Sequence, residues 1–282
     1  MPSFDTPDPV SATVRVDAGS VRLIASDRTD TEVTVLPRSP KKDADLKAAE
    51  RTQVGYAGGV LTVAAPKIRY PLGRGGTVDV VIELPTGSRV EVDGSWTELR
   101  SEGRLGEVRA EISTGDVHLE ATGPLQLTSS HGSVSVDHVQ GAAEISSSSG
   151  NLRVGTVEGS AVLKNSHGST SVGTVTGELR VSAASGGVSV ERAEGSVQAK
   201  TAHGALRIAE IARGSVELES QNGSIEVGIR PGSAAWLDVS SERGHVHNAL
   251  TATDGPEPEG GTDTVEVRAH TRWGNIEIRR AR

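Results

Sequence analysis

The sequence predicts an all-β protein whose middle part is a β-solenoid, similar to a parallel β-helix. Three observations lead to this fold class: glycine recurs at a fixed interval, short apolar alternations follow the glycines, and aromatic rings are scarce. Of 282 residues, 34 are glycine, whereas Phe, Tyr and Trp make up only 2%. Because aromatic rings supply much of the buried area of a thick core, this composition indicates a thin core between closely spaced sheets.

Two series of glycines mark the repeat, each with an interval of 18 residues and offset from the other by nine. The first is Gly132, Gly150, Gly168, Gly186 and Gly204, and the second is Gly123, Gly141, Gly159, Gly177 and Gly195. One added residue near Arg213 then shifts the series to Gly214, Gly223 and Gly232. Each 18-residue coil therefore consists of two unlike nine-residue half-units, and glycine at the corners permits positive φ.

Apolar residues occupy equivalent places in successive coils and form columns. The columns are Val136, Val154, Val172, Val190, Ile208 and Val227; Leu127, Ile145, Leu163, Val181, Ala199 and Leu218; and Val139, Val157, Val175, Ala193 and Ile211. Polar residues such as Ser135, Arg153 and Ser171 alternate with them. A period of two is typical of a strand with one buried face, and each half-unit has room for a strand of about five residues.

Two architectures fit such strands. In a β-solenoid each coil places two strands on opposite faces, and equivalent residues stack about 4.8 Å apart. In an antiparallel meander neighbouring strands run in opposite directions, so like residues would not stack on like. The constant composition of the columns favours the solenoid.

We divide the chain into three regions. Residues 1–110 are predicted to be an irregular, β-rich N-terminal cap. Residues 111–250 are the regular solenoid, with about eight coils. Residues 251–282 are a loop followed by C-terminal capping strands. Caps are expected because the terminal repeats of a stacked array must protect an open sheet edge from pairing with other chains.

Several elements of the terminal regions can be assigned. Strands are expected at "SATVRV", "SVRLIAS", "TEVTVLP", "VLTVAAP", "TVDVVIELP" and "SRVEVD". Lys41 to Gln53 is a short helix or a charged loop, and "YPLGRGG" and "TATDGPEPEGGTD" are loops rich in turn residues. We expect Trp236 and Trp273 to close the last coils, because the ends are where a large ring fits.

Composition excludes several classes of function. The net charge of −8, from 37 acidic and 29 basic residues, argues against a nucleic-acid partner, which requires a cationic face. The absence of cysteine excludes disulfides and thiol catalysis. The start "MPSFDTPDPVSATVRV" does not resemble a signal peptide, and no apolar run reaches the roughly 18 residues of a membrane span. We expect a cytoplasmic protein.

His131, His167 and His203 precede lattice glycines in alternate coils and form a candidate ligand-binding edge. Equivalent positions two coils apart lie about 9.6 Å from each other, too far for two histidines to bind one zinc ion at about 2.0–2.1 Å. We therefore expect turn residues rather than a metal site. His245 and His247 are also candidates, since residues two apart on a strand share a face, but no carboxylates nearby in sequence complete a metal site.

Other chemistry finds little support. A calcium β-roll requires G-G-x-G-x-D turns, whereas the turns here read "SSHGS", "SSSGN" and "TAHGA". No G-x-S-x-G elbow accompanies a histidine and an acid. Carbohydrate binding commonly uses exposed aromatic rings, and no Phe, Tyr or Trp lies between Trp96 and Trp236. We expect no cofactor.

The phrases "VRVDAGSVRLIASDRTDTEVTV", "VVIELPTGSRVEVD", "STGDVHL", "SSHGSVSV", "SSSGNLRV" and "SQNGSIEV" resemble the bacterial "putative adhesin" family of β-strand-repeat domains of unknown function. The resemblance covers most of the chain. It implies an all-β, solenoid-like fold and no defined activity, and it supplies no active-site residues. Some relatives look like envelope-associated proteins with membrane anchors, and this chain shows no such anchor.

The sequence thus favours a non-enzymatic structural or interaction protein that presents flat faces to a macromolecular partner, in a cell-envelope or stress-response system. The partner would be a protein or an envelope component, and oligomers could form through the ends or faces of the solenoid. The alternative is a carbohydrate-binding or carbohydrate-active β-helix protein.

Overall fold

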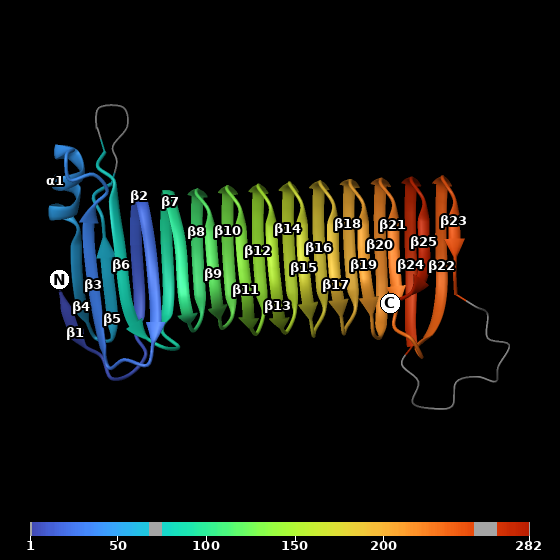
Figure 1. Ribbon diagram of the computed structural model, residues 1–282, viewed down its shortest axis with the longest axis horizontal. Helices are drawn as coiled ribbons and strands as arrows, with labels where there is room; N and C mark the ends of the chain where they lie inside the picture. The colour runs from blue at the N-terminus through green and yellow to red at the C-terminus, as the bar shows by residue number, and fades with distance from the viewer. Residues whose placement is uncertain (1, 68–74, 251–263, 282) are drawn as a thin grey trace. The chain divides into compact units, whose positions relative to one another are not determined.

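The structure is a computed structural model that describes residues 2–67, 75–250 and 264–281. It confirms the all-β class: the described residues form strands together with a single helix, α1 (Asp43–Arg51). Figure 1 shows the strands and this helix. Most of the first predicted loop, residues 70–76, and all of the second, residues 251–263, lie outside the described residues. No helix of the described part is long and apolar enough to cross a membrane.

The chain folds as two compact units, Met1–Gln140 and Gly141–Arg282. The strands of the first unit are β1 (Ser3–Asp5), β2 (Ser11–Ser26), β3 (Asp30–Pro37), β4 (Gln53–Ala57), β5 (Val60–Ala64), β6 (Val78–Pro85), β7 (Arg89–Arg104), β8 (Val108–Thr114), β9 (Val117–Thr122), β10 (Leu125–His131) and β11 (Val134–Gln140). The bounds of the three regions proposed from sequence stay a prediction.

The strands of the second unit are β12 (Ala143–Ser149), β13 (Leu152–Glu158), β14 (Ala161–His167), β15 (Thr170–Val175), β16 (Leu179–Ser185), β17 (Val188–Ala193), β18 (Val197–His203), β19 (Leu206–Ile211), β20 (Gly214–Asn222), β21 (Ile225–Ile229), β22 (Ala234–Arg243), β23 (Val246–Asn248), β24 (Thr264–Trp273) and β25 (Ile276–Arg280).

In the first unit, long strands replace the two-strand coil. β2 and β7 pair in parallel from Ser11 opposite Arg89 to Ile24 opposite Glu102. The first half of β7 stacks on β8 and the second half on β9. Parallel stacking therefore already occurs within residues 1–110, which the sequence assigned to an irregular cap. Antiparallel pairs occur among the N-terminal strands of the same unit, at β1–β3, β3–β6 and β4–β5.

Helix α1 confirms the helical alternative for Lys41 to Gln53. Its Asp45 is 4% exposed and accepts backbone hydrogen bonds from Ser39 (3.2 Å) and Thr77 (2.9 Å). A buried carboxylate needs such donors, because leaving it unpaired would be costly. Asp45 thus ties the helix to the chain segments before and after it.

The second unit has the predicted solenoid geometry. Its strands form two stacks of parallel neighbours, one beginning with β12 and β14 and the other with β13 and β15. Val154, Val172 and Val190 pair in register, as do Leu163, Val181 and Ala199. The predicted columns are therefore confirmed within this unit, which excludes the antiparallel meander.

The corner glycines serve a further purpose besides permitting positive φ. Gly186 has a φ of 132°, and a Cβ atom added to it would lie 2.1 Å from the carbonyl oxygen of Gly168 in the preceding coil. Real Cβ atoms do not approach an oxygen so closely. The spacing of the lattice therefore reflects the close approach of successive coils at their corners, in addition to the conformational freedom of glycine.

Buried polar side chains support the same corners from inside. Asn165, 2% exposed, donates from Nδ2 to the carbonyl oxygens of Gly150 and Gly168, both at 3.2 Å. Thr271, fully buried, donates to the carbonyl of Gly223 at 2.9 Å. These side chains satisfy carbonyl groups of the tight turns that would otherwise face the apolar interior.

The C-terminal strands depart from the predicted order. β24 pairs in parallel with β20 on one side and with β22 on the other, and β25 lies in the same way between β21 and β23. The expectation of C-terminal capping strands is therefore wrong. β22 and β23 precede β24 and β25 in the sequence, but β24 and β25 lie between them and the earlier coils.

We expect Val172→Asp to destabilise the protein by more than about 3 kcal/mol, because it places an unpaired charge in the core. Val172 is fully buried. Ser171→Asp, at the neighbouring exposed position, should change the free energy of unfolding by less than about 0.5 kcal/mol. Urea unfolding of both variants measures the difference, and equal damage from the two would refute the assigned alternation.

Two adjacent glycines allow a matched test of the corner. Gly186→Ala should destabilise the protein by about 1–3 kcal/mol or more, because it combines a strained φ with the contact to Gly168. A Cβ atom at Gly187 would meet no atom closer than 3.5 Å, so Gly187→Ala should be close to neutral. Thermal melts of the two variants provide the comparison. Similar melting temperatures would show that the corner does not require glycine.

Candidate functional site: the charged faces of the coils

The histidines singled out from the sequence lie at strand ends and are exposed. His167 pairs in register with Ser149 and Ser185, and His203 pairs with Ser185 and Asn222. The structure thus places His167 and His203 in one column, separated by one serine and about 9.6 Å apart. The third candidate, His131, belongs to the first unit and pairs with Thr114.

The backbone of these histidines has a clear structural role. The carbonyl of His131 accepts a hydrogen bond from the N–H of Gly115, that of His167 from Gly150, and that of His203 from Gly186. Each histidine therefore anchors the corner glycine of the preceding coil. Ligand binding by the three side chains stays a prediction.

His245 and His247 are both exposed, but only His247 lies within β23. Within residues 2–67, 75–250 and 264–281, no three side chains of the His, Asp or Glu type lie close enough together to hold a metal ion.

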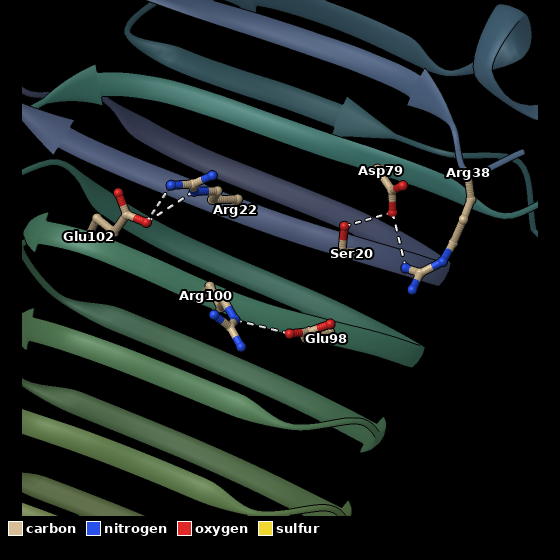
Figure 2. Close-up of polar contacts among 7 residues, drawn as sticks. All are labelled: Ser20, Arg22, Arg38, Asp79, Glu98, Arg100 and Glu102. Carbon is tan, nitrogen blue, oxygen red and sulfur yellow. Dashed lines mark hydrogen bonds and ion pairs between the residues drawn. The ribbon is translucent and has the colours of Figure 1, made fainter.

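One outer face of the first unit is covered by charged and polar pairs (Figure 2). On β2, Ser20 donates to Asp79 of β6 at 2.7 Å, and Arg22 contacts Glu102 of β7 at 2.6 Å. Figure 2 shows two further pairs: Arg38 contacts the same oxygen of Asp79 at 3.2 Å, and Arg100 contacts Glu98 at 3.0 Å. Each arginine on this face thus has a carboxylate partner, although Arg22 and Arg100 are themselves register partners.

A tighter cluster surrounds Arg28, whose side chain is only 16% exposed. The guanidinium forms two hydrogen bonds with Asp30, at 2.9 and 3.0 Å, and also contacts Glu83 and Glu32. The hydrogen bonds from Arg28 lower the pKa of Asp30, and those to Asp30 raise the pKa of Arg28. Arg28 is saturated by carboxylates and acts as a structural clamp between β2, β3 and β6.

In the second unit, Lys200 is the centre of a charged group on the β16–β18–β20 face. Its Nζ lies 3.0 Å from Glu219 and 3.5 Å from Glu217. The hydrogen bond with Glu219 raises the pKa of Lys200, and a hydrogen bond from Gln198, at 2.7 Å, lowers the pKa of Glu217. Lys200 and Glu217 therefore keep their charges across the whole neutral range of pH.

A shallow depression of about 200 Å³ lies beside Lys200. Its lining consists of Ser182, Ala183, Lys200, Thr201, Ala202, Glu219 and Gln221. Two of the outward positions that line the depression, next to Lys200 and Glu219, carry the small side chains of Ser182 and Ala202.

The opposite stack carries its own ladder of ion pairs. Glu226 of β21 lies between Arg207 of β19, at 3.5 Å, and Arg279 of β25, whose Nε is 2.9 Å away. Glu210 of β19 is held in the same way by Arg192 at 3.4 Å and Arg230 at 2.7 Å. Arg192 and Arg207 are about half exposed, whereas Glu210, Glu226 and Arg279 are more deeply placed. Pairs at the exposed arginines typically contribute at most about 1 kcal/mol.

One serine and one histidine meet in a way that the sequence did not reveal. Ser240 Oγ lies 2.9 Å from His270 Nδ1, and His270 Nε2 lies 3.9 Å from Glu242. The second distance exceeds a hydrogen bond. His270 and Glu242 are also half exposed on a sheet surface, at 49% and 55%. Nucleophilic catalysis requires closer contacts and exclusion of water, which this arrangement does not provide.

The tryptophans do not close the coils. Trp236 and Trp273 are 53% and 47% exposed, so the expectation that they fill the ends is wrong. The guanidinium of Arg243 lies 4.3 Å from the ring centre of Trp273, a cation–π contact. Trp96 of the first unit is also about half exposed, at 52%. Exposed rings are therefore present at Trp96, Trp236 and Trp273, all outside the stretch between Trp96 and Trp236 that contains no Phe, Tyr or Trp.

Sequence reasoning missed the Ser240–His270 and Arg243–Trp273 contacts for the same reason. Both join β22 to β24, which become neighbours only because β24 inserts beside β22. By contrast, the Arg207–Glu226 pair could have been found, since both residues occupy one polar column of the repeat.

Several solved structures align with nearly the whole of this chain at low sequence identity. A "putative adhesin" from Parabacteroides merdae has 14% identity and a TM-score of 0.36, covering 98% of this chain and 94% of the other. A "putative lipid binding protein" from Parabacteroides distasonis has 13% identity and a TM-score of 0.34, covering 100% and 96%. A "putative cell adhesion protein" from Clostridium sporogenes has 11% identity and a TM-score of 0.27, covering 99% and 98%.

Among curated proteins, no sequence matches this chain. The family DUF4097, described as Toastrack, matches residues 11–279 and therefore nearly the whole chain. This match agrees with the resemblance to the "putative adhesin" repeat domains and with the stacked parallel strands. The chain belongs to the DUF4097 (Toastrack) family.

Proposed function

We propose that this protein is a non-enzymatic, adhesin-like interaction module that presents a flat solenoid face to a macromolecular partner. The observation that carries the proposal is the β16–β18–β20 face of the second unit, where Lys200, Glu217 and Glu219 lie beside the depression lined by Ser182 and Ala202. This face carries charges of both signs at fixed positions, next to a shallow depression. Such a surface is suited to recognition of a partner rather than to chemical turnover.

The chemistry of this face indicates a protein partner. Acidic and basic residues alternate, so the face lacks the uniform positive charge that a nucleic acid requires. Mixed charges give a protein interface its specificity and its association rate. The proposal keeps the cytoplasmic location predicted from the sequence, which fractionation of the host cells would test. It also keeps a role in a cell-envelope or stress-response system.

The exposed tryptophans support a second candidate, carbohydrate binding. Trp236 is 53% exposed on β22, and amphipathic rings of this kind can stack against apolar surfaces of a ligand. Binding of envelope glycans at this ring should quench the tryptophan fluorescence and raise the melting temperature. Trp236→Ala should abolish both effects. Failure of a broad set of envelope glycans to produce either effect counts against this candidate.

The main proposal predicts the effect of a charge reversal. Lys200→Glu should reduce capture of the partner from host lysate at least tenfold, because it places three carboxylates at one point of the face. The melting temperature should change little, since Lys200 is 47% exposed and exposed pairs contribute little stability. Partners captured by the wild-type protein are identified by mass spectrometry, and each is then quantified with the variant.

The matched control is Arg207→Glu on the opposite stack, where Arg207 is 54% exposed. It should leave capture unchanged, and capture by the wild-type protein should weaken as salt screens the charges. Equal capture by the wild-type protein and Lys200→Glu would contradict the assignment of this face. Turnover of a substrate that a surface substitution abolishes would contradict the non-enzymatic proposal.

A further inference from the structure

The last strands of the two stacks in the second unit, β22 and β23, leave the end of the core open. Within the described part of the chain, β22 pairs only with β24, and β23 only with β25. The inward residues of β22, namely Ala235, Leu237 and Val239, are all partly exposed. Their register partners in β24 are Val265, Val267 and Ala269, which are 0%, 0% and 3% exposed.

The same difference occurs in the other stack. Val246 of β23 is 43% exposed, whereas its register partner Ile276 of β25 is fully buried. The open end therefore carries an apolar row on β22 and the single apolar residue Val246 on β23, where the other inward position is Asn248, opposite Ile278. Both lie beside backbone N–H and C=O groups of a strand edge that is unpaired within the described residues. Solenoids usually cover such an end with a polar terminal repeat, because an exposed apolar edge pairs with other chains.

The first unit shows how this chain protects an edge. There the parallel arrangement gives way to antiparallel pairs at β1–β3, β3–β6 and β4–β5, and helix α1 lies against β3 and β6. Neither device is present among the described residues around β22 and β23, where the strand pairings are parallel. The open end of the second unit thus resembles an interface rather than a protected edge.

We propose that two copies of this chain associate end to end through β22 and β23. A partner for this end must supply both an unpaired strand edge and a row of exposed apolar side chains, and the same end of a second copy supplies both. Contact between like ends is isologous and closes at the dimer. The antiparallel pairs and helix of the first unit do not match this edge, so growth into filaments is not expected.

The size of the end predicts the strength of the dimer. β22 has ten residues, which corresponds to an edge of about 33 Å. With stacks about 10 Å apart, the end covers on the order of 300 Å². A standard stable interface buries roughly 800 Å² on each partner. We therefore expect a reversible dimer with a dissociation constant in the micromolar range. The proposal is independent of the function proposed for the charged face.

Sedimentation velocity of the full chain tests the proposal at concentrations from about 1 to 200 μM. The wild-type protein should shift from monomer to dimer over this range. Val239→Lys should raise the dissociation constant at least tenfold, because it places a charge in the apolar row. Val239 is only partly buried, so the variant should still fold, as circular dichroism will show. Ser171→Lys, exposed on β15, is the control and should dimerise normally.

Cross-linking provides a second measurement, because the chain has no native cysteine. Val239 lies at the centre of β22, so a twofold axis through this strand would bring the two copies of the residue together. Val239→Cys should form a disulfide-linked dimer under mild oxidation, whereas Ser171→Cys should not. A wild-type protein that stays monomeric throughout the range would overturn the proposal. Unchanged dimerisation of Val239→Lys, or equal cross-linking of both cysteine variants, would also overturn it.

Discussion

The structure depends on one constraint: successive parallel strands stack in register, with equivalent residues in contact. In the second unit, this register places Val154, Val172 and Val190 in one buried column. It also brings the corner backbones so close that a side chain at Gly186 would collide with the carbonyl of Gly168. The repeat of apolar residues and the repeat of glycines are therefore two consequences of the same stacking distance, about 4.8 Å.

The same constraint applies to the outer faces. Any residue type repeated at an outward position would stack on itself, and like charges at that distance repel. Two columns of the second unit avoid this repulsion by alternation: Ser182 separates Lys164 from Lys200 in one column, and Ser185 separates His167 from His203 in another. Arg207 and Glu226 are neighbours of opposite sign, whereas Glu226 faces Glu277 on its other side and is there compensated by Arg279. The serines of the repeat thus act as spacers, which explains their abundance without invoking nucleophiles.

Stacking also decides what could be predicted from the sequence. The periodicity of the sequence reveals the apolar columns and the corner glycines, and a shift in it reveals the added residue near Arg213. The register of the second unit follows this pattern, and after the insertion Val197 lies opposite Val216. The position of β24 could not be found in this way. Its register with β20 and β22 depends on a return of the chain, and a periodic pattern reports which strands stack but not in which order the chain supplies them. The contacts of His270 and Trp273 were hidden for that reason.

Specific features arise where the stacking is interrupted. A uniform solenoid face offers the same surface at every coil, so a partner would have no preferred position along it. The small outward side chains of Ser182 and Ala202 line the depression beside Lys200, which gives this part of the face a local feature of shape. The insertion of β24 also creates a distinct position, at the open end. It makes β22 the outermost strand of its stack and leaves Leu237 and Val239 partly exposed. The periodic residues account for stability, and the departures from periodicity give the otherwise uniform surface distinct positions at which specific binding is physically possible.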